Sequence, residues 1–350
     1  MTSQAKIRLV VGIVVGLTLL AASVASLWRI DPFGERGSKI SKRSDQDVDA
    51  YPPGDPRHVD PRTIAYRQSG EWALDQEHPR AIATGPADRV YVAGDHQVLV
   101  FAAEGKSLAL LNLVGEPSCI AVGGADHKFP GAVYVGLPGR VVRLDGQGAV
   151  VAELNEGLEE ASVLTSIALA EEDVFVADAG HRIVLRFGLD GKLVRRIGEC
   201  NSLRGVPGFV LPSPYFDIAV TSDGLLRVAH TGARRIETYT FEGDLLGHWG
   251  AASATSEGFF GCCNPANFAV LPNGCFVTVE KGLPRVKVYS HQGVFESFVA
   301  TPQELAPGTI TEDARDDTRQ KPFDVAADSR GRVLLLDPNS HTVRIFERQG

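Results

Sequence analysis

The sequence predicts an all-β protein: a six-bladed β-propeller of four-stranded blades, preceded by one N-terminal transmembrane helix and a flexible linker. Two observations carry this prediction. Six copies of one strand-rich unit recur at intervals of 38 to 57 residues. An uncharged segment near the N-terminus is long enough to cross a bilayer. Of the 350 residues, 44% are apolar and 37 are glycine, which suits a large core with many tight turns.

The segment Leu9–Trp28 carries no charged residue. A helix of that length spans about 30 Å, the thickness of the hydrocarbon layer. Residues 1–29 are therefore predicted to anchor the chain in the cytoplasmic membrane in a single pass, with the rest of the chain extracytoplasmic. The alternative is a signal segment cleaved near Ser23–Ala25, which leaves a secreted or periplasmic protein. Arg36 and Lys39, soon after the segment, argue for the reverse orientation.

Residues 30–62 are predicted to be a disordered linker. This stretch contains Pro52, Pro53, Pro56 and Pro61, many charges and few apolar side chains, so it cannot bury enough surface to offset the entropy of ordering. The whole chain has 35 Lys and Arg against 43 Asp and Glu, a net charge of −8. No nucleic-acid partner is expected from that charge.

Residues 63–350 carry the repeats. Each copy begins with a short strand that holds an Ile-Ala-like pair, followed by a second strand, a polar loop, a third strand, a glycine turn and a fourth strand. The pairs are Ile82-Ala83, Ile120-Ala121, Ile167-Ala168, Ile218-Ala219, Phe268-Ala269 and Val325-Ala326. Four strands at this period are typical of a propeller blade.

The last copy ends after its third strand, near Phe346. A fourth strand is available at the other end of the repeat region, in residues 63–75. Pairing the two would join the first and last blades and remove two exposed sheet edges. A solenoid is the alternative, but it does not need this complementary truncation.

Two hairpins resemble NHL repeats. They read VADAGHRIVLRF, with Asp178, Arg182 and Ile183 as the best matches, and LLDPNSHTVRIF, with Asp337, Asn339 and Val343. The resemblance covers residues 63–350 and implies a six-bladed propeller. The segment that begins GCCNP at Gly261 and ends EKGLPRVKVY is similar to membrane-anchored bacterial NHL-repeat proteins. Propellers include both binding modules and enzymes, so the resemblance implies no particular activity.

Propeller topology predicts which loops share a face. The connection into the first strand of a blade and the loop between its second and third strands lie on one side. Candidate residues for a ligand or partner face map to that side: Tyr215, Asp217, Cys262, Cys263, Asn264, Glu280, Lys281, Arg285, His181, His230 and His341.

The adjacent Cys262 and Cys263 allow three interpretations. They could ligate a soft metal ion together with Cys200 or a loop histidine. They could be redox-active, because a disulfide between neighbours is strained and easily reduced. They could also be inert thiols or part of a structural disulfide. Cys119 and Cys275, beside and within strands, are expected to be packing residues.

The remaining candidates also have simpler structural explanations. Glu280 with Lys281 and Arg285 is interpreted as a surface charge cluster, with an anionic ligand group as the alternative. The histidines could share one site near the channel. Asp217 and Asp324, at matching positions before the Ile-Ala-like pair, are expected to brace the blades through hydrogen bonds to loop amides.

The leading functional hypothesis is a membrane-tethered, non-catalytic binding module or scaffold for a protein or peptide partner, with no cofactor. One alternative is a redox or metal-handling module centred on Cys262 and Cys263. The other is a metal-dependent hydrolase or lyase of the gluconolactonase-like type. The first alternative requires a soft metal ion or thiol chemistry, and the second requires a divalent metal ion.

Overall fold

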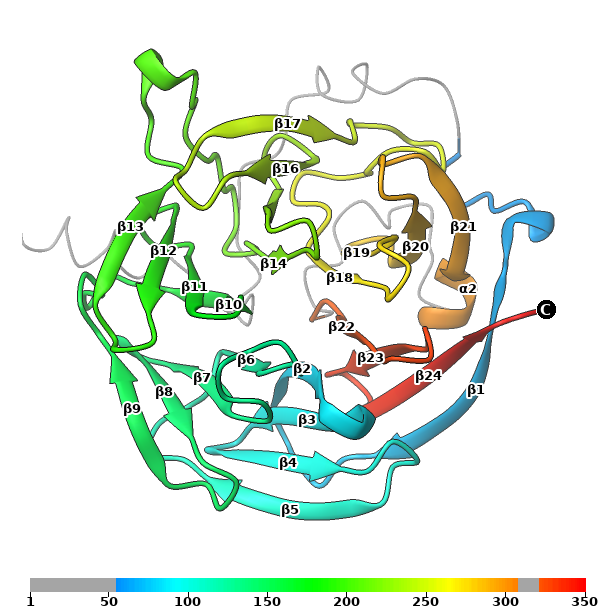
Figure 1. The fold of residues 1–350 in the computed structure, drawn as a ribbon. Coiled ribbons are helices and arrows are strands. Elements are labelled where there is room, and N and C mark those ends of the chain that lie inside the picture. Colours follow the sequence, from blue (N-terminus) through cyan, green and yellow to red (C-terminus); the bar gives the residue numbers. More distant parts are fainter. Residues whose placement is uncertain (1–54, 308–320) are drawn as a thin grey trace, which may run out of the picture.

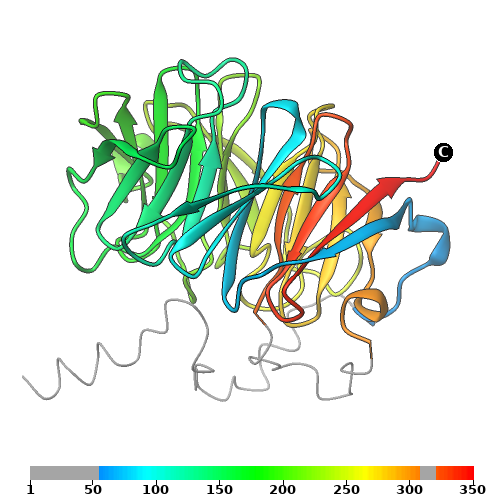
Figure 2. The ribbon, with the colours of Figure 1, turned by 90° about the horizontal axis from the view of Figure 1, so that it is seen from below.

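The computed structural model describes residues 55–307 and 321–350, which form six four-stranded antiparallel sheets. The sheets are arranged radially as the blades of a propeller (Figure 1). Viewed from the side, the blades form a disc (Figure 2). The six-bladed, four-stranded architecture predicted from the sequence is confirmed.

Each blade is listed from its innermost strand outward. Blades 1 to 3 are β2 (Pro79–Gly85), β3 (Arg89–Gly94), β4 (Gln97–Phe101) and β5 (Ser107–Asn112); β6 (Cys119–Val122), β7 (Val133–Leu137), β8 (Arg140–Leu144) and β9 (Val150–Leu154); and β10 (Leu164–Leu169), β11 (Asp173–Asp178), β12 (Ile183–Gly188) and β13 (Leu193–Ile197). Blades 4 to 6 are β14 (Ile218–Val220), β15 (Leu226–His230), β16 (Arg235–Tyr239) and β17 (Leu245–Trp249); β18 (Asn267–Val270), β19 (Phe276–Glu280), β20 (Arg285–Tyr289) and β21 (Phe295–Ala300); and β22 (Asp324–Ala327), β23 (Val333–Asp337), β24 (Thr342–Arg348) and β1 (Tyr66–Ala73).

The middle strands are apolar on both faces because each blade is covered by two neighbours. In β3, Val90 and Val92 pack toward blade 6, whereas Tyr91 and Ala93 pack toward blade 2. This follows from the alternation of side chains along a strand. The described residues form one apolar cluster at each of the six blade interfaces, and the cluster between blades 4 and 5 has the fewest buried members.

The ring closes within blade 6, where β1 pairs antiparallel with β24 from Tyr66↔Arg348 to Ala73↔Thr342. Strand β1 lies inside the range 63–75 from which the sequence predicts this strand. Leu334, Leu336 and Val343 of the closed blade are fully buried against blade 1. The N-terminal strand and the last strand of the chain therefore share one sheet (Figure 1).

Two long connections fold back over the blades that follow them. We call residues 198–217 the first insertion and residues 250–266 the second insertion. Phe209 of the first lies so close to Gly198 that a Cβ atom there has no room, and Phe259 of the second likewise leaves no room for a Cβ atom at Gly250. Both glycines have positive φ angles, 87° and 92°. The repeated arrangement places an insertion over blade 4 and another over blade 5.

The predicted anchor, residues 1–29, lies outside the described residues, as does most of the predicted linker 30–62. The described end of the linker includes a 3₁₀ turn at Pro61–Thr63. Before it, the Arg57 carbonyl accepts a hydrogen bond of 3.3 Å from Gln303 of the short helix α2 (Pro302–Leu305). Within residues 55–307 and 321–350, no helix has the length and apolarity needed to cross a membrane.

The closing interface is expected to contribute strongly to stability. Leu334→Ala removes a fully buried side chain between blades 6 and 1 and should lower the free energy of unfolding by about 2 to 5 kcal/mol. The matched variant Leu110→Ala, on the outer strand β5 and 50% exposed, should cost about 0.5 kcal/mol or less. Urea denaturation of both variants measures the difference. Equal losses would contradict this account of the closure.

Candidate functional site

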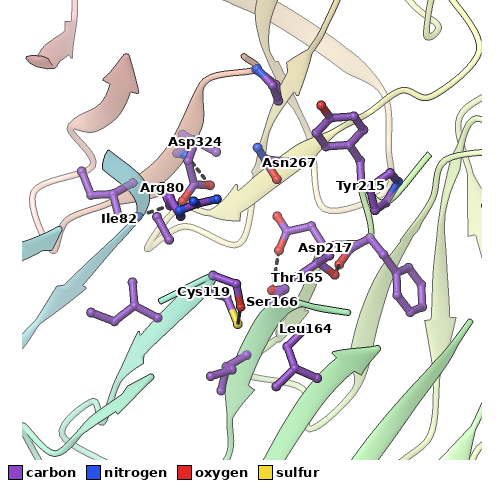
Figure 3. A pocket seen from close by; sticks show the side chains of 18 of the residues that line it. Arg80, Ile82, Cys119, Leu164, Thr165, Ser166, Tyr215, Asp217, Asn267 and Asp324 are labelled. Carbon is purple, nitrogen blue, oxygen red and sulfur yellow. Dashed lines mark hydrogen bonds between the residues drawn. The ribbon is translucent and has the colours of Figure 1, made fainter. Parts of the chain in front are cut away.

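The first strands of all six blades begin around one pocket on the central axis, with a volume of about 230 Å³. We call this pocket the channel mouth. Each blade contributes a polar side chain to its lining: Arg80, Ser118, Ser166, Asp217, Asn267 and Asp324. Figure 3 shows five of these groups, Arg80, Ser166, Asp217, Asn267 and Asp324, around the opening, with Tyr215 nearby. The pocket lies on the face that the loop topology predicts.

Asp217 links three consecutive blades. Its Oδ1 accepts hydrogen bonds from Ser166 Oγ of blade 3 at 2.6 Å and from the Ile218 amide at 2.9 Å. Its Oδ2 accepts from the Phe268 amide of blade 5 at 2.7 Å. These bonds hold the carboxylate at the channel wall and fix the spacing of the innermost strands.

Asp324 repeats the arrangement where the ring closes. Its Oδ1 accepts from the Val325 amide at 2.9 Å, and its Oδ2 accepts from the Ile82 amide of blade 1 at 2.8 Å. The expected bracing role is therefore present, with one correction. The amides belong to the innermost strands, including those of neighbouring blades, rather than to loops, because each carboxylate lies at the start of a strand beside the next blade.

Burial raises the pKa of Asp217 to about 6, despite the hydrogen bonds that favour its ionised form. Burial, and then the negative charge of Asp217, raise the pKa of Asp324 to about 7. The channel mouth thus contains two interacting carboxyl groups that change protonation state close to neutral pH.

The predicted residues on blades 4 and 5 form a second group beside the channel mouth. Lys281 Nζ lies 5.0 Å from the centre of the Tyr215 ring, and Tyr215 lines the pocket. Asn264 is buried and joins two loops: its Oδ1 accepts from the Lys281 amide at 2.8 Å, and its Nδ2 donates to the Lys281 carbonyl at 3.1 Å. Cys262 and Cys263 directly precede Asn264 along the chain.

Glu280 and Arg285 do not form the surface charge cluster expected from the sequence. Their side chains are 0% and 1% exposed, and Arg285 Nη2 donates to Glu280 Oε2 at 2.6 Å. Lys287 Nζ, also fully buried, lies 2.6 Å from Glu280 Oε1. The second insertion covers this cluster, because Lys287 donates to the carbonyls of Ser256 and Gly258.

Both members of the central ion pair have shifted pKa values. Burial alone would raise the pKa of Glu280, but Arg285 and Lys287 hold it below its usual value. Burial lowers the pKa of Lys287 to about 7, although Glu280 opposes the shift. The cluster is buried between blades 4 and 5, where the apolar cluster has the fewest members.

Blade 4 contains a related network under the first insertion. The buried Glu237 carboxylate accepts from Tyr239 Oη at 2.8 Å and contacts His230 Nδ1 at 2.9 Å and Arg235 Nη2 at 2.5 Å. The Val210 amide of the insertion donates to His230 Nε2 at 2.8 Å. His230 is therefore part of a buried network rather than an exposed face.

The three histidines predicted for this face lie on different blades. His181 of blade 3 contacts Asp178 at 2.8 Å, and His230 belongs to the blade 4 network. His341 lies in the turn of blade 6, where its carbonyl accepts from the Leu74 amide. In the part of the chain that the structure describes, no three His, Cys, Asp or Glu side chains are grouped to hold a metal ion.

All five cysteines have free thiols in the described residues. Cys200 is exposed on the first insertion, whereas Cys119 and Cys275 are buried. Burial raises the pKa of Cys119 to about 12, although Ser118 opposes the shift. Cys262 and Cys263 are the neighbouring pair, with 3.2 Å between their Sγ atoms.

Sequence reasoning missed Lys287 and Glu237. They lie at equivalent positions in the third strands of blades 4 and 5, on the face that packs toward the preceding blade. Blade 3 has the apolar Leu185 at this position. Aligning the repeats would have revealed a charge at an interior position, which requires a buried partner.

No protein-family model matches the chain, and a search of curated proteins gives no match. Solved structures with a similar fold include a protein of unknown function from Bacteroides thetaiotaomicron VPI-5482, with a TM-score of 0.59, 14% identity, and coverage of 81% of this chain and 76% of that chain. A streptogramin B lyase has a TM-score of 0.55 and 13% identity over 81% of this chain and 98% of that chain. A virginiamycin B lyase from Staphylococcus aureus has a TM-score of 0.53 and 13% identity over 81% and 100%. Such low identities support the propeller fold alone.

The buried cluster of blade 5 is expected to depend on its carboxylate. Glu280→Gln leaves the Arg285 cation and the Lys287 amino group buried without their carboxylate partner and should lower the free energy of unfolding by about 3 to 5 kcal/mol. Glu172→Gln breaks an exposed pair with Lys128 and should cost about 1 kcal/mol or less. Denaturant unfolding at neutral pH compares the two. A small loss for both would show that the buried pair contributes no more than a surface pair.

The channel carboxyls should make stability depend on pH. Between the ordinary pKa of 3.8 and about 7, folded Asp324 binds more protons than unfolded Asp324. Raising the pH from about 5 to about 7 should therefore lower the free energy of unfolding by about 1.4 kcal/mol for each pH unit, and the loss should level off above the raised pKa. Asp324→Asn should reduce this slope, and the exposed variant Asp190→Asn should leave it unchanged. An unchanged slope in Asp324→Asn would contradict the raised pKa.

Proposed function

We propose that this propeller is a non-catalytic binding module that captures a protein or peptide partner at the channel mouth. The observation that carries the proposal is the convergence of polar side chains from all six blades on one pocket. A closed ring holds these groups rigidly, so a partner meets a preorganised site.

The size of the pocket favours one side chain over a whole small molecule. Pockets for drug-sized ligands usually measure about 300 to 1,000 Å³. The channel mouth, at about 230 Å³, suits a single long side chain or a chain terminus. Tyr215, Pro214 and Pro338 line its opening and can contact the rest of the partner.

Two cations, Arg80 and Lys321, line the pocket with the two carboxyls, and it is the buried carboxyls that favour a basic group. Burial raises the cost of ionising both carboxyls, and the charge of Asp217 adds to that cost for Asp324. A lysine, arginine or free amino terminus bound beside them would offset this cost. Each carboxylate has acceptor capacity beyond the hydrogen bonds described above, because a carboxylate offers about four acceptor positions. In blade 1, Ala81 occupies the position that Asp217 and Asp324 occupy in blades 4 and 6. Its neighbour Arg80 is paired with Glu116 at 3.0 Å.

The membrane tether and the NHL-type classification are further parts of the proposal and rest on sequence. The uncharged segment Leu9–Trp28 supports the tether, and the hairpin motifs at Asp178 and Asp337 support the classification. A tethered disc with a binding face would hold its partner close to the membrane surface.

Peptide selection tests the binding proposal. A random dodecapeptide display library is selected on the immobilised full-length chain, and the best peptide is synthesised. We expect it to contain an essential Lys, Arg or free amino terminus. Replacing that group, or introducing Asp217→Asn with Asp324→Asn, should weaken binding at least tenfold. Affinity should rise between pH 5.5 and 7.5, because the carboxylates ionise over that range.

The variant Phe129→Ala provides the control. Phe129 is 39% exposed in the loop between β6 and β7, on the opposite face of the disc, and its loss should leave peptide affinity unchanged. A library that yields no binder, or peptides that bind equally well to the double Asp variant, would overturn the proposal.

A further inference from the structure

The neighbouring thiols of Cys262 and Cys263 lie beside the channel mouth, on the loop that directly precedes Asn264. Their Sγ atoms lie 3.2 Å apart, and the two residues differ in exposure. Cys263 is buried with 1% of its surface exposed, whereas Cys262 is partly exposed. The pair therefore combines one thiol that solvent can reach with one that is shielded.

Hydrogen bonds fix the loop that carries the thiols. Arg234 Nε donates to the Gly261 carbonyl at 2.8 Å, just before the pair. Directly after it, Asn264 Oδ1 accepts from the Lys281 amide at 2.8 Å. The thiols are thus held in contact by a loop that is attached on both sides to neighbouring blades.

The geometry favours a sulfur–sulfur bond over a bridging metal ion. Two thiolates on one tetrahedral zinc ion lie about 3.7 Å apart, because each Zn–S bond is about 2.3 Å long. The observed separation is shorter than that. In the described residues, the thiols also have no third His, Cys, Asp or Glu grouped with them for a metal ion.

We propose that Cys262 and Cys263 form a redox-active dithiol site that exchanges with small-molecule or protein disulfides. The partly exposed Cys262 thiolate attacks one sulfur of the external disulfide, forms a mixed disulfide and releases one thiol. Cys263, after losing its proton, attacks the Cys262 sulfur and expels the second thiol. Overall, two thiols are oxidised to one bond between Cys262 and Cys263, and one external disulfide is reduced to two thiols.

The surroundings assign different roles to the two cysteines. The hydrogen bond with Cys262 and burial raise the pKa of Cys263, and the nearby Lys281 charge opposes the shift. Cys263 is therefore a poor first nucleophile and suits the resolving step, in which its partner is already in contact. Cys262 takes the first step because it is the accessible member of the pair.

The test uses the full-length chain in glutathione buffers ranging from fully reduced to fully oxidised. Samples are acid-quenched, denatured and alkylated, and the peptide that contains residues 236–281 is sequenced by mass spectrometry. We expect the form bridged between Cys262 and Cys263 to rise from a minor to the major species and to disappear on reduction. Cys275 in the same peptide should remain alkylatable, because it is buried in the folded protein during exchange.

Two variants test the order of attack. In Cys263→Ser, the mixed disulfide with glutathione should accumulate at Cys262, because the resolving thiol is missing. In Cys262→Ser, the buried Cys263 should remain unmodified under the same conditions. The exposed Cys200 serves as the internal positive control for glutathione reactivity. If Cys200 reacts while no bridge forms in the wild type, or if Cys262 bridges to Cys200 instead, the proposal is overturned.

Discussion

The pairing of β1 with β24 is the contact on which the rest of this structure depends. A blade is apolar on both faces, so each blade needs two neighbours, and only a closed ring supplies both to all six. Closure also brings the six innermost strands to a common axis. The channel mouth exists because the ring closes: its lining comes from positions that are far apart along the chain, from Pro79 to Pro338.

At the channel mouth, the same groups maintain the ring and face the opening. Asp217 and Asp324 accept amide hydrogen bonds from neighbouring blades, yet their burial disfavours the ionised form that accepts those bonds best. An apolar ring of side chains would avoid this conflict. Keeping charge there at a cost in stability is typical of sites that serve binding or catalysis.

The repeats allowed most of the fold to be predicted from the sequence, because a short apolar pair marks each innermost strand and the truncated last copy matches the strand near residue 66. The site was predicted less well. Glu280 and Arg285 were expected at the surface, since a polar loop between two strands is usually solvated. The second insertion covers them, and neither its path nor its carbonyl contacts with Lys287 can be read from local patterns. The matching repeat positions of Asp217 and Asp324 predicted their bracing role, although the amides that they bind lie in the innermost strands rather than in loops.

The buried networks of blades 4 and 5 use the same two strand positions, with the acidic residue on opposite strands. Blade 4 has a base, His230, on its second strand and an acid, Glu237, on its third, whereas blade 5 has Glu280 on its second and Lys287 on its third. Each network retains an arginine, Arg235 or Arg285, at the start of the third strand. A change at one of these positions leaves the facing charged or polar group buried without its partner. Substitutions at these positions are therefore constrained to occur in pairs within each blade.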